Sequence, residues 1–121
     1  MKSRLVLVIG LTCLLCVGVF FDFSTIAQSA PRRIEVVASK FVFSPAELTL
    51  KKGQPVVLVL KSNDVPHGLR FRELKVDIKV GKGGTSEVQF TPNQTGDFVG
   101  HCSVFCGSGH GSMTLTMHVV D

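Results

Sequence analysis

The sequence predicts an all-β domain, a sandwich or small barrel of about eight short strands, which follows an N-terminal export segment. Runs of β-branched and aromatic residues recur at short intervals from residue 30 onward. Clusters of Gly, Pro, Asn and Asp separate these runs. No stretch between Ala30 and Asp121 shows sustained helical periodicity. A chain of 121 residues is therefore expected to hold one β domain.

The expected strands are short and follow one another closely. They lie at residues 34–37, 41–43, 47–50, 56–60, 74–80, 86–90, 97–100 and 113–120. Turn signals separate them at residues 44–45, 51–55, 63–64, 81–84 and 91–96. In the last strand the polar Thr114, Thr116 and His118 alternate with apolar residues, so one face is buried and the other wet. His118 is accordingly expected on the solvent face or at a sheet edge, away from any metal.

The first 29 residues have the order of a secretory signal. Lys2 and Arg4 precede an apolar run over residues 5–21, and small and polar residues follow at 24–30. We expect residues 1–29 to be a signal peptide cleaved after Ser29 or Ala27, or an N-terminal membrane anchor, because the apolar run is near the lower limit for spanning a bilayer. In both cases the domain at 30–121 is expected outside the cytoplasm, in the periplasm or on the extracytoplasmic face of the membrane.

The charge of the domain is modestly positive and spread along the chain. From Ala30 onward there are eleven Lys or Arg residues and eight Asp or Glu residues, an excess of three. A dispersed excess of this size favours solubility and an acidic partner, and it argues against nucleic acid as the target.

The segment from Cys102 to Met113 carries the chemistry of the chain. It places the thiols of Cys102 and Cys106, the imidazole of His110 and the thioether of Met113 at the spacing Cys-x3-Cys-x3-His-x2-Met. Soft sulfur ligands with imidazole select copper, zinc or iron over magnesium and calcium. The segment is glycine-rich and joins two expected strands, as a ligand-bearing loop would. A closed site needs a donor from elsewhere in the chain, for which His67 is the candidate.

Two features of this region allow other interpretations. Cys102 and Cys106 are the cysteines outside the apolar leader, and an exported domain with one close cysteine pair could instead form a disulfide. His101 neighbours Cys102 but by strand alternation points to the opposite side, so a supporting or solvent-facing role is expected rather than ligation.

The string CSVFCGSGHGSM, preceded by DVPHGL, resembles the cupredoxin domain of cytochrome c oxidase subunit II, which carries the binuclear CuA centre. A similar centre occurs in nitrous oxide reductase. The resemblance extends over most of residues 34–121. It implies a cupredoxin-like Greek-key β-sandwich or barrel that binds two copper ions and carries single electrons, and it implies no enzymatic activity of its own.

Transferred residue by residue, the resemblance implies six metal ligands. They are Cys102 and Cys106 as bridging thiolates, His67 and His110 as terminal imidazoles, Met113 as a weak thioether and Val104 through its backbone carbonyl. Apolar cover by Leu69, Val104 and Phe105 is expected to tune the centre.

The chain also departs from the oxidase pattern. Val104 stands where the oxidase subunit has a glutamate between the two cysteines, and the chain has no Trp or Tyr. It has one apolar segment where the subunit has a transmembrane hairpin. We therefore expect a free-standing or singly anchored CuA-like electron carrier, whose partner is a redox protein such as a cytochrome c or a terminal oxidase or reductase.

Three other metal functions use the same donors. A mononuclear cupredoxin could bind one copper through His67, Cys106, His110 and Met113, leaving Cys102 aside. A periplasmic copper-binding or delivery protein could hold copper in a labile site. A structural zinc site of two Cys and two His is the third possibility. Disulfide exchange is disfavoured because it would want a Cys-x-x-Cys pair at a helix N-terminus.

Overall fold

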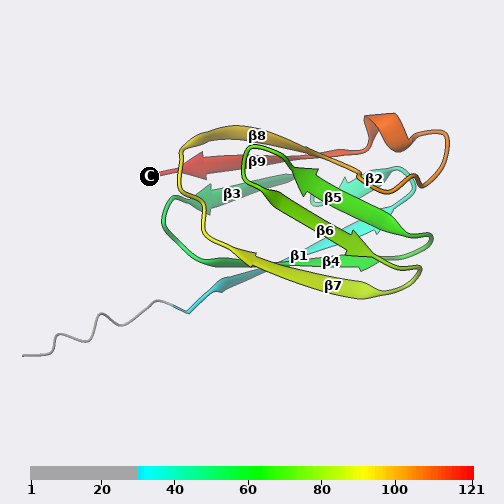
Figure 1. Ribbon diagram of the computed structural model, residues 1–121, viewed down its shortest axis with the longest axis horizontal. Coiled ribbons are helices and arrows are strands. Elements are labelled where there is room, and N and C mark those ends of the chain that lie inside the picture. The colour runs from blue at the N-terminus through cyan, green and yellow to red at the C-terminus, as the bar shows by residue number, and fades with distance from the viewer. Residues whose placement is uncertain (1–29) are drawn as a thin grey trace, which may run out of the picture.

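The computed structural model describes residues 30–121, and the expected export segment lies outside them. The prediction of an all-β fold is confirmed, with nine strands in two sheets across the described residues (Figure 1). The four-stranded sheet has the order β2 (Val42–Ser44), β1 (Arg32–Ser39), β4 (Val56–Ser62), β7 (Thr85–Phe90). The five-stranded sheet has the order β3 (Glu47–Lys51), β9 (Thr114–Val120), β8 (Gly96–His101), β5 (His67–Phe71), β6 (Val76–Val80). A 3-10 turn, η1 (His110–Ser112), precedes β9. None of the helical structure in residues 30–121 is long and apolar enough to cross a bilayer.

Each sheet contains one parallel pair that joins strands distant in the sequence. In the four-stranded sheet β1 pairs with β4 in parallel, and in the five-stranded sheet β3 pairs with β9 in parallel. The remaining pairs are antiparallel. The contact between β5 and β8 is short, with Arg70 opposite His101 as its one registered pair.

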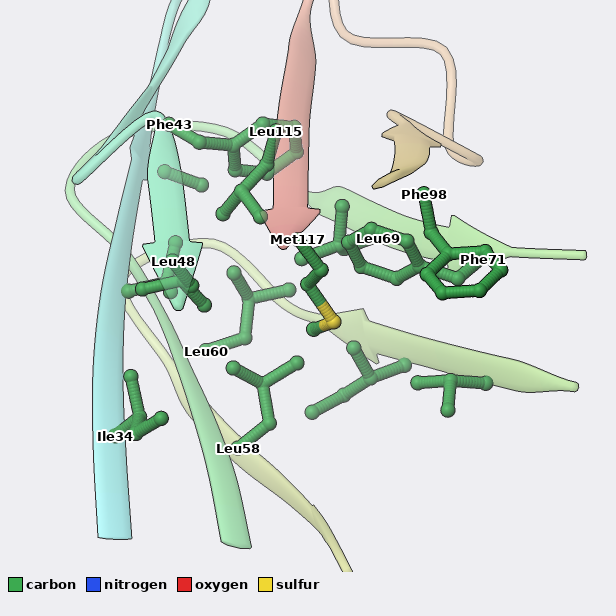
Figure 2. Close-up of a cluster of buried hydrophobic side chains, with 14 of the residues drawn as sticks. Ile34, Phe43, Leu48, Leu58, Leu60, Leu69, Phe71, Phe98, Leu115 and Met117 are labelled. Atoms are coloured by element: carbon green, nitrogen blue, oxygen red, sulfur yellow. The ribbon is translucent and has the colours of Figure 1, made fainter. Parts of the chain in front are cut away.

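The core lies between the two sheets and follows the alternation of the strands. Leu58 and Leu60 on β4 face Leu115 and Met117 on β9, and Phe71 on β5 closes one side of the cluster (Figure 2). All five side chains are fully buried, and burying each stabilises the fold by roughly 1.5–3 kcal/mol. The segments that carry the predicted metal donors are built onto this core.

One strand was missing from the sequence-based prediction. No strand was expected between residues 60 and 74, but residues 67–71 form β5, because they pair in antiparallel register with β6 from His67–Val80 to Phe71–Val76. The strand expected at 74–80 begins only at Val76, since residues 72–75 form the tight turn between β5 and β6. In this turn Lys75 has a φ of 54° and its N–H donates to the carbonyl of Arg72 over 3.1 Å.

Candidate metal centre

Three strands of the five-stranded sheet bring the predicted donors to one end of the sandwich. His67 is the first residue of β5, Cys102 follows the last residue of β8, and Met113 precedes β9. In Figure 1 the loop between β8 and β9, with its short turn η1, lies at the same end as the start of β5. The backbone N–H of Cys102 donates to the carbonyl of Met113 over 3.1 Å, which closes the base of this loop.

The side chains of His67, Cys102 and Cys106 form a compact donor group. One potential ligand atom from each lies within 4.8 Å of the others, and all three residues are buried. Cys106 is the centre of the wider set, because its Sγ lies 3.7 Å from His110 Nδ1 and 3.8 Å from Met113 Sδ. The structure therefore brings together all five side chains that the sequence singled out.

The two cysteines are close but not bonded. Their Sγ atoms are 3.8 Å apart and both thiols are free, whereas a disulfide requires about 2.05 Å. The backbone carbonyl of Val104 lies 3.2 Å from Cys102 Sγ, on the segment between the two thiols. The disulfide alternative is thus not the arrangement that this structure shows.

The thiol of Cys106 is held in its neutral form. Burial, followed by its contact with Cys102, raises the pKa of Cys106 to about 11. At neutral pH this thiol keeps its proton in the absence of a metal, and a metal that binds the thiolate must displace that proton.

The imidazole of His67 is oriented by a carboxylate and leaves one nitrogen free. His67 is fully buried, and its Nε2 lies 2.6 Å from Asp64 Oδ1. Asp64 also accepts hydrogen bonds from the backbone N–H groups of Lys40 (2.8 Å) and Val65 (2.7 Å). The N–H of Lys40, with smaller contributions from His67 and Val65, lowers the pKa of Asp64 to about 2, so the carboxylate is ionised and Nε2 donates to it.

The other ring nitrogen of His67, Nδ1, is buried and has no hydrogen-bond partner, which bears on whether a metal fits this site. With Nε2 protonated, Nδ1 carries a lone pair. Among the buried side-chain nitrogen and oxygen atoms of residues 30–121, Nδ1 of His67 is the one without a hydrogen-bond partner. A buried acceptor left without a partner costs about 1–3 kcal/mol. A buried histidine that donates one N–H to a carboxylate, keeps its other nitrogen unpartnered and lies in one group with two thiols fits a metal ligand.

A second network fixes the segment that follows Cys102. The N–H of Ser103 donates to the carbonyl of Gly68 over 3.3 Å, and its hydroxyl donates to Asp77 Oδ1 over 3.3 Å. Arg70 donates to Asp77 Oδ2 from Nε and Nη2, over 3.0 and 2.7 Å, and lowers the pKa of that carboxyl group. A Cβ atom on Gly68 would collide with the Ser103 hydroxyl, so glycine is required for this close approach of β5 to the loop.

The surface of the site differs from the prediction in one respect. Leu69 is buried in the core, but Phe105 is 78% exposed. The centroid of the Phe105 ring lies 5.6 Å from that of the His110 imidazole, within the same loop. Phe41, before β2, supports the other side of the loop, because its ring occupies the space that a side chain at Gly107 or Gly109 would fill.

The remaining histidines lie outside the donor group. His101 is exposed while its neighbour Cys102 is buried, in keeping with strand alternation. His118 lies on the outer face of β9, where its Nδ1 is 2.6 Å from Asp97 Oδ1. This carboxylate raises the pKa of His118.

Sequence reasoning missed three residues that support the site. Asp64 precedes His67 by three residues, and this spacing could have identified it as the partner of the imidazole. Gly68 could have been suspected because glycine within a strand often marks a close backbone approach. Phe41 had no local signal, because it reaches the loop only through the tertiary fold.

A β-sandwich that gathers two buried thiols, a buried thioether and the imidazoles of His67 and His110 at one end defines a protein that binds a soft metal ion. Residues 11–115 match the sequence profile described as cupredoxin-like domain. The chain belongs to this cupredoxin-like family.

Its relatives include a cytochrome c oxidase subunit 2 and a nitrous-oxide reductase. Over 98 residues the chain is 28% identical to cytochrome c oxidase subunit 2 of Thermus thermophilus, covering 79% of this chain and 73% of that protein. Over 90 residues it is 31% identical to nitrous-oxide reductase of Cupriavidus necator, covering 71% of this chain and 14% of the reductase. It superimposes on the periplasmic domain of subunit II of cytochrome oxidase (CoxB) of Bradyrhizobium japonicum with a TM-score of 0.69 at 19% identity, over 77% of this chain and 86% of that one.

These relatives confirm the resemblance to oxidase subunit II and nitrous oxide reductase. Two other oxidase subunits are matched over 58% and 23% of their length, so in these relatives the matched region is one part of a longer chain. The family and the buried His67, Cys102 and Cys106 group together support copper as the metal.

Proposed function

We propose that this protein is an extracytoplasmic electron carrier with a binuclear, CuA-like copper centre. The observation that carries the proposal is the pair of buried thiols, whose Sγ atoms are 3.8 Å apart and near His67. A single copper of the cupredoxin type needs one thiolate, whereas two copper ions that share the pair use both thiols.

In this proposal six groups hold the two ions. They are the thiolates of Cys102 and Cys106, the imidazoles of His67 and His110, the thioether of Met113 and the carbonyl of Val104. Bound copper would supply the one-electron redox change.

The protein would keep the geometry of the site the same in both oxidation states. Asp64 fixes the ring of His67, and the Ser103–Gly68 hydrogen bond fixes the loop beside Cys102. Met113 is fully buried and presents a soft sulfur, which favours the reduced state and raises the potential. The burial of His67 and Met113 excludes water from that side of the centre.

The location and partner of the protein follow from the same proposal. Residues 1–29 would direct the domain out of the cytoplasm as a signal peptide or anchor, and the structurally similar CoxB domain is itself periplasmic. The chain would exchange single electrons with a redox protein such as a cytochrome c or a terminal oxidase or reductase. It would carry electrons and catalyse no reaction on a substrate.

Metal analysis combined with electron paramagnetic resonance of the copper-loaded protein tests the proposal. We expect two coppers per chain and hyperfine coupling of the unpaired electron to both nuclei. One copper per chain with coupling to a single nucleus would contradict the binuclear centre. Rapid electron exchange with a cytochrome would support a carrier, whereas fast loss of copper to a competing chelator would support copper delivery.

A mononuclear centre is the second candidate, and one observation favours it. Cys106 alone contacts both His110 (3.7 Å) and Met113 (3.8 Å), so a single copper could be bound around this residue with His67 as the fourth ligand. Its function would again be electron transfer. The same resonance measurement separates the two candidates.

A further inference from the structure

A pocket of about 360 Å³ opens on the outer face of the five-stranded sheet, beside the candidate metal centre. It lies where the short β5–β8 contact leaves room between the two strands. Its lining residues come from the ends of these strands and the segments that follow them. They are Arg70, Arg72, Glu73, Val99, His101, Cys102 and Ser103.

The pocket contains hydrogen-bond donors from Arg70, Arg72 and Ser103, of which Arg70 and Ser103 are already bound to Asp77. Both carboxylate oxygens of Asp77 are occupied, one by Ser103 and the other by Arg70. Arg72 is exposed and makes no ion pair with any residue of the described domain. Of the lining residues, Glu73 alone is acidic. The surplus of donors suits an anionic oxygen ligand.

Positive charges around the pocket also favour an anionic ligand. Lys75 lies in the turn after Arg72, and Lys79 is exposed on the outer face of β6 beside Asp77. The described domain carries an excess of three positive charges. Such a surface attracts acidic proteins over long range and repels basic ones.

Cys102 connects this surface to the proposed redox centre. The residue lines the pocket, yet its side chain belongs to the buried donor group with His67 and Cys106. A protein docked here would therefore lie directly against a proposed copper ligand. Short separation between the two redox centres is what an electron-transfer contact requires.

We propose that this pocket is the docking site of an acidic redox protein, whose surface carboxylates bind Arg70, Arg72 and His101. The inference rests on the proposed electron-transfer function. In each encounter the reduced redox group of the partner would lose one electron, and copper held by His67, Cys102 and Cys106 would gain that electron. Small anions such as phosphate share the chemistry of the ligand, but the proposed ligand is a carboxylate on a protein surface.

Electron exchange with one cytochrome c in two charge states tests the docking. The probes are a basic cytochrome c and the same protein with its lysines succinylated, which makes it acidic. The copper-loaded protein is expected to react faster with the succinylated form at low salt. Arg72→Glu should slow this reaction about tenfold, whereas Lys52→Glu, an equal charge change at the opposite end of the sandwich, should slow it less than about twofold.

Equal slowing by the two variants, or a faster reaction with the basic form, would overturn the proposal. Amide NMR of the copper-free protein, titrated with the succinylated cytochrome, gives a second readout that needs no metal. Shifts at residues 70–73 and 99–103 are expected. Chemical-shift changes confined to the exposed Phe105 and its surroundings would place the protein contact elsewhere and contradict the proposal that the pocket is the docking site. If the protein held no redox-active copper, electron exchange would be absent while the NMR shifts at the pocket remained, which separates the two proposals.

Discussion

Two histidine–aspartate pairs occur among residues 30–121, one at each end of the five-stranded sheet, and their geometry is nearly the same. His67 lies 2.6 Å from Asp64, and His118 lies 2.6 Å from Asp97. The difference is in the surroundings. The side chain of His67 is 0% exposed and that of His118 is 35% exposed.

The surroundings decide what each pair can do. The second nitrogen of His67 is buried without a hydrogen-bond partner, and the imidazole offers a ring nitrogen within 4.8 Å of both thiols. The second nitrogen of His118 faces Glu47 at 3.7 Å, on the outer face of the sheet. A carboxylate beside an imidazole is therefore no sign of a metal site by itself. A metal site is indicated when the histidine also has a buried ring nitrogen without a hydrogen-bond partner and lies in one group with other soft donors.

The largest expected effect concerns the thiols that make the first pair special. Cys102→Ser should lower the copper content from two per chain toward one and change the visible spectrum, because a hydroxyl cannot bridge two coppers as a thiolate does. Metal analysis and absorption spectroscopy measure both changes. Ser108→Ala, an exposed change in the same loop, is the control and should keep two coppers. An unchanged copper count in Cys102→Ser would refute the bridging role.

The two aspartates provide a matched test of the comparison. Asp64→Asn removes the charge that orients His67, and its amide N–H₂ replaces one of two accepting oxygens, either Oδ2, which accepts from Lys40, or Oδ1, which accepts from Val65 and His67. Copper affinity should fall by about ten- to hundredfold, measured by competition with a chelator. Asp97→Asn makes the same chemical change at His118 and should leave the affinity unaltered. Equal losses in the two variants would remove the distinction between the pairs.

A smaller effect is expected from the contact that ties β5 to the ligand loop. Gly68→Ala places a methyl group against the Ser103 hydroxyl, and overpacking of this kind costs about 1–3 kcal/mol in the free energy of unfolding. Urea denaturation of the copper-free protein measures the loss. Gly81→Ala is the control, because a Cβ there meets no neighbouring atom. Equal stability of the two variants would show that the loop can move away from β5.

The smallest effect is a pH dependence at the outer pair. Asp97 raises the pKa of His118 in the folded protein above its ordinary value of 6.5. The ion pair therefore stabilises the fold fully below pH 6.5, and this contribution is lost as the pH rises through the folded pKa. Asp97→Asn should lower the melting temperature at pH 6 and change it little at pH 9. An equal shift at both pH values would mean that the imidazolium is not involved.

Local patterns predicted the outer architecture and the ligand loop well, because both depend on residues close together in the sequence. The alternation in β9 identified its buried face, and the spacing from Cys102 to Met113 identified the donors. β5 was missed because Gly68 and Arg70 weaken its strand pattern, and only pairing with β6 makes it a strand. Phe105 was misassigned because the direction of a loop side chain depends on the whole fold.

The unequal burial of the two candidate imidazoles has a kinetic consequence. His67 is sealed in the interior, while His110 is half-buried on the short turn η1. Replacement of a protein donor by water therefore starts at His110, where only a three-residue turn has to move. The rate of metal release from the folded protein is accordingly expected to follow the local opening of this turn and not the unfolding of the sandwich.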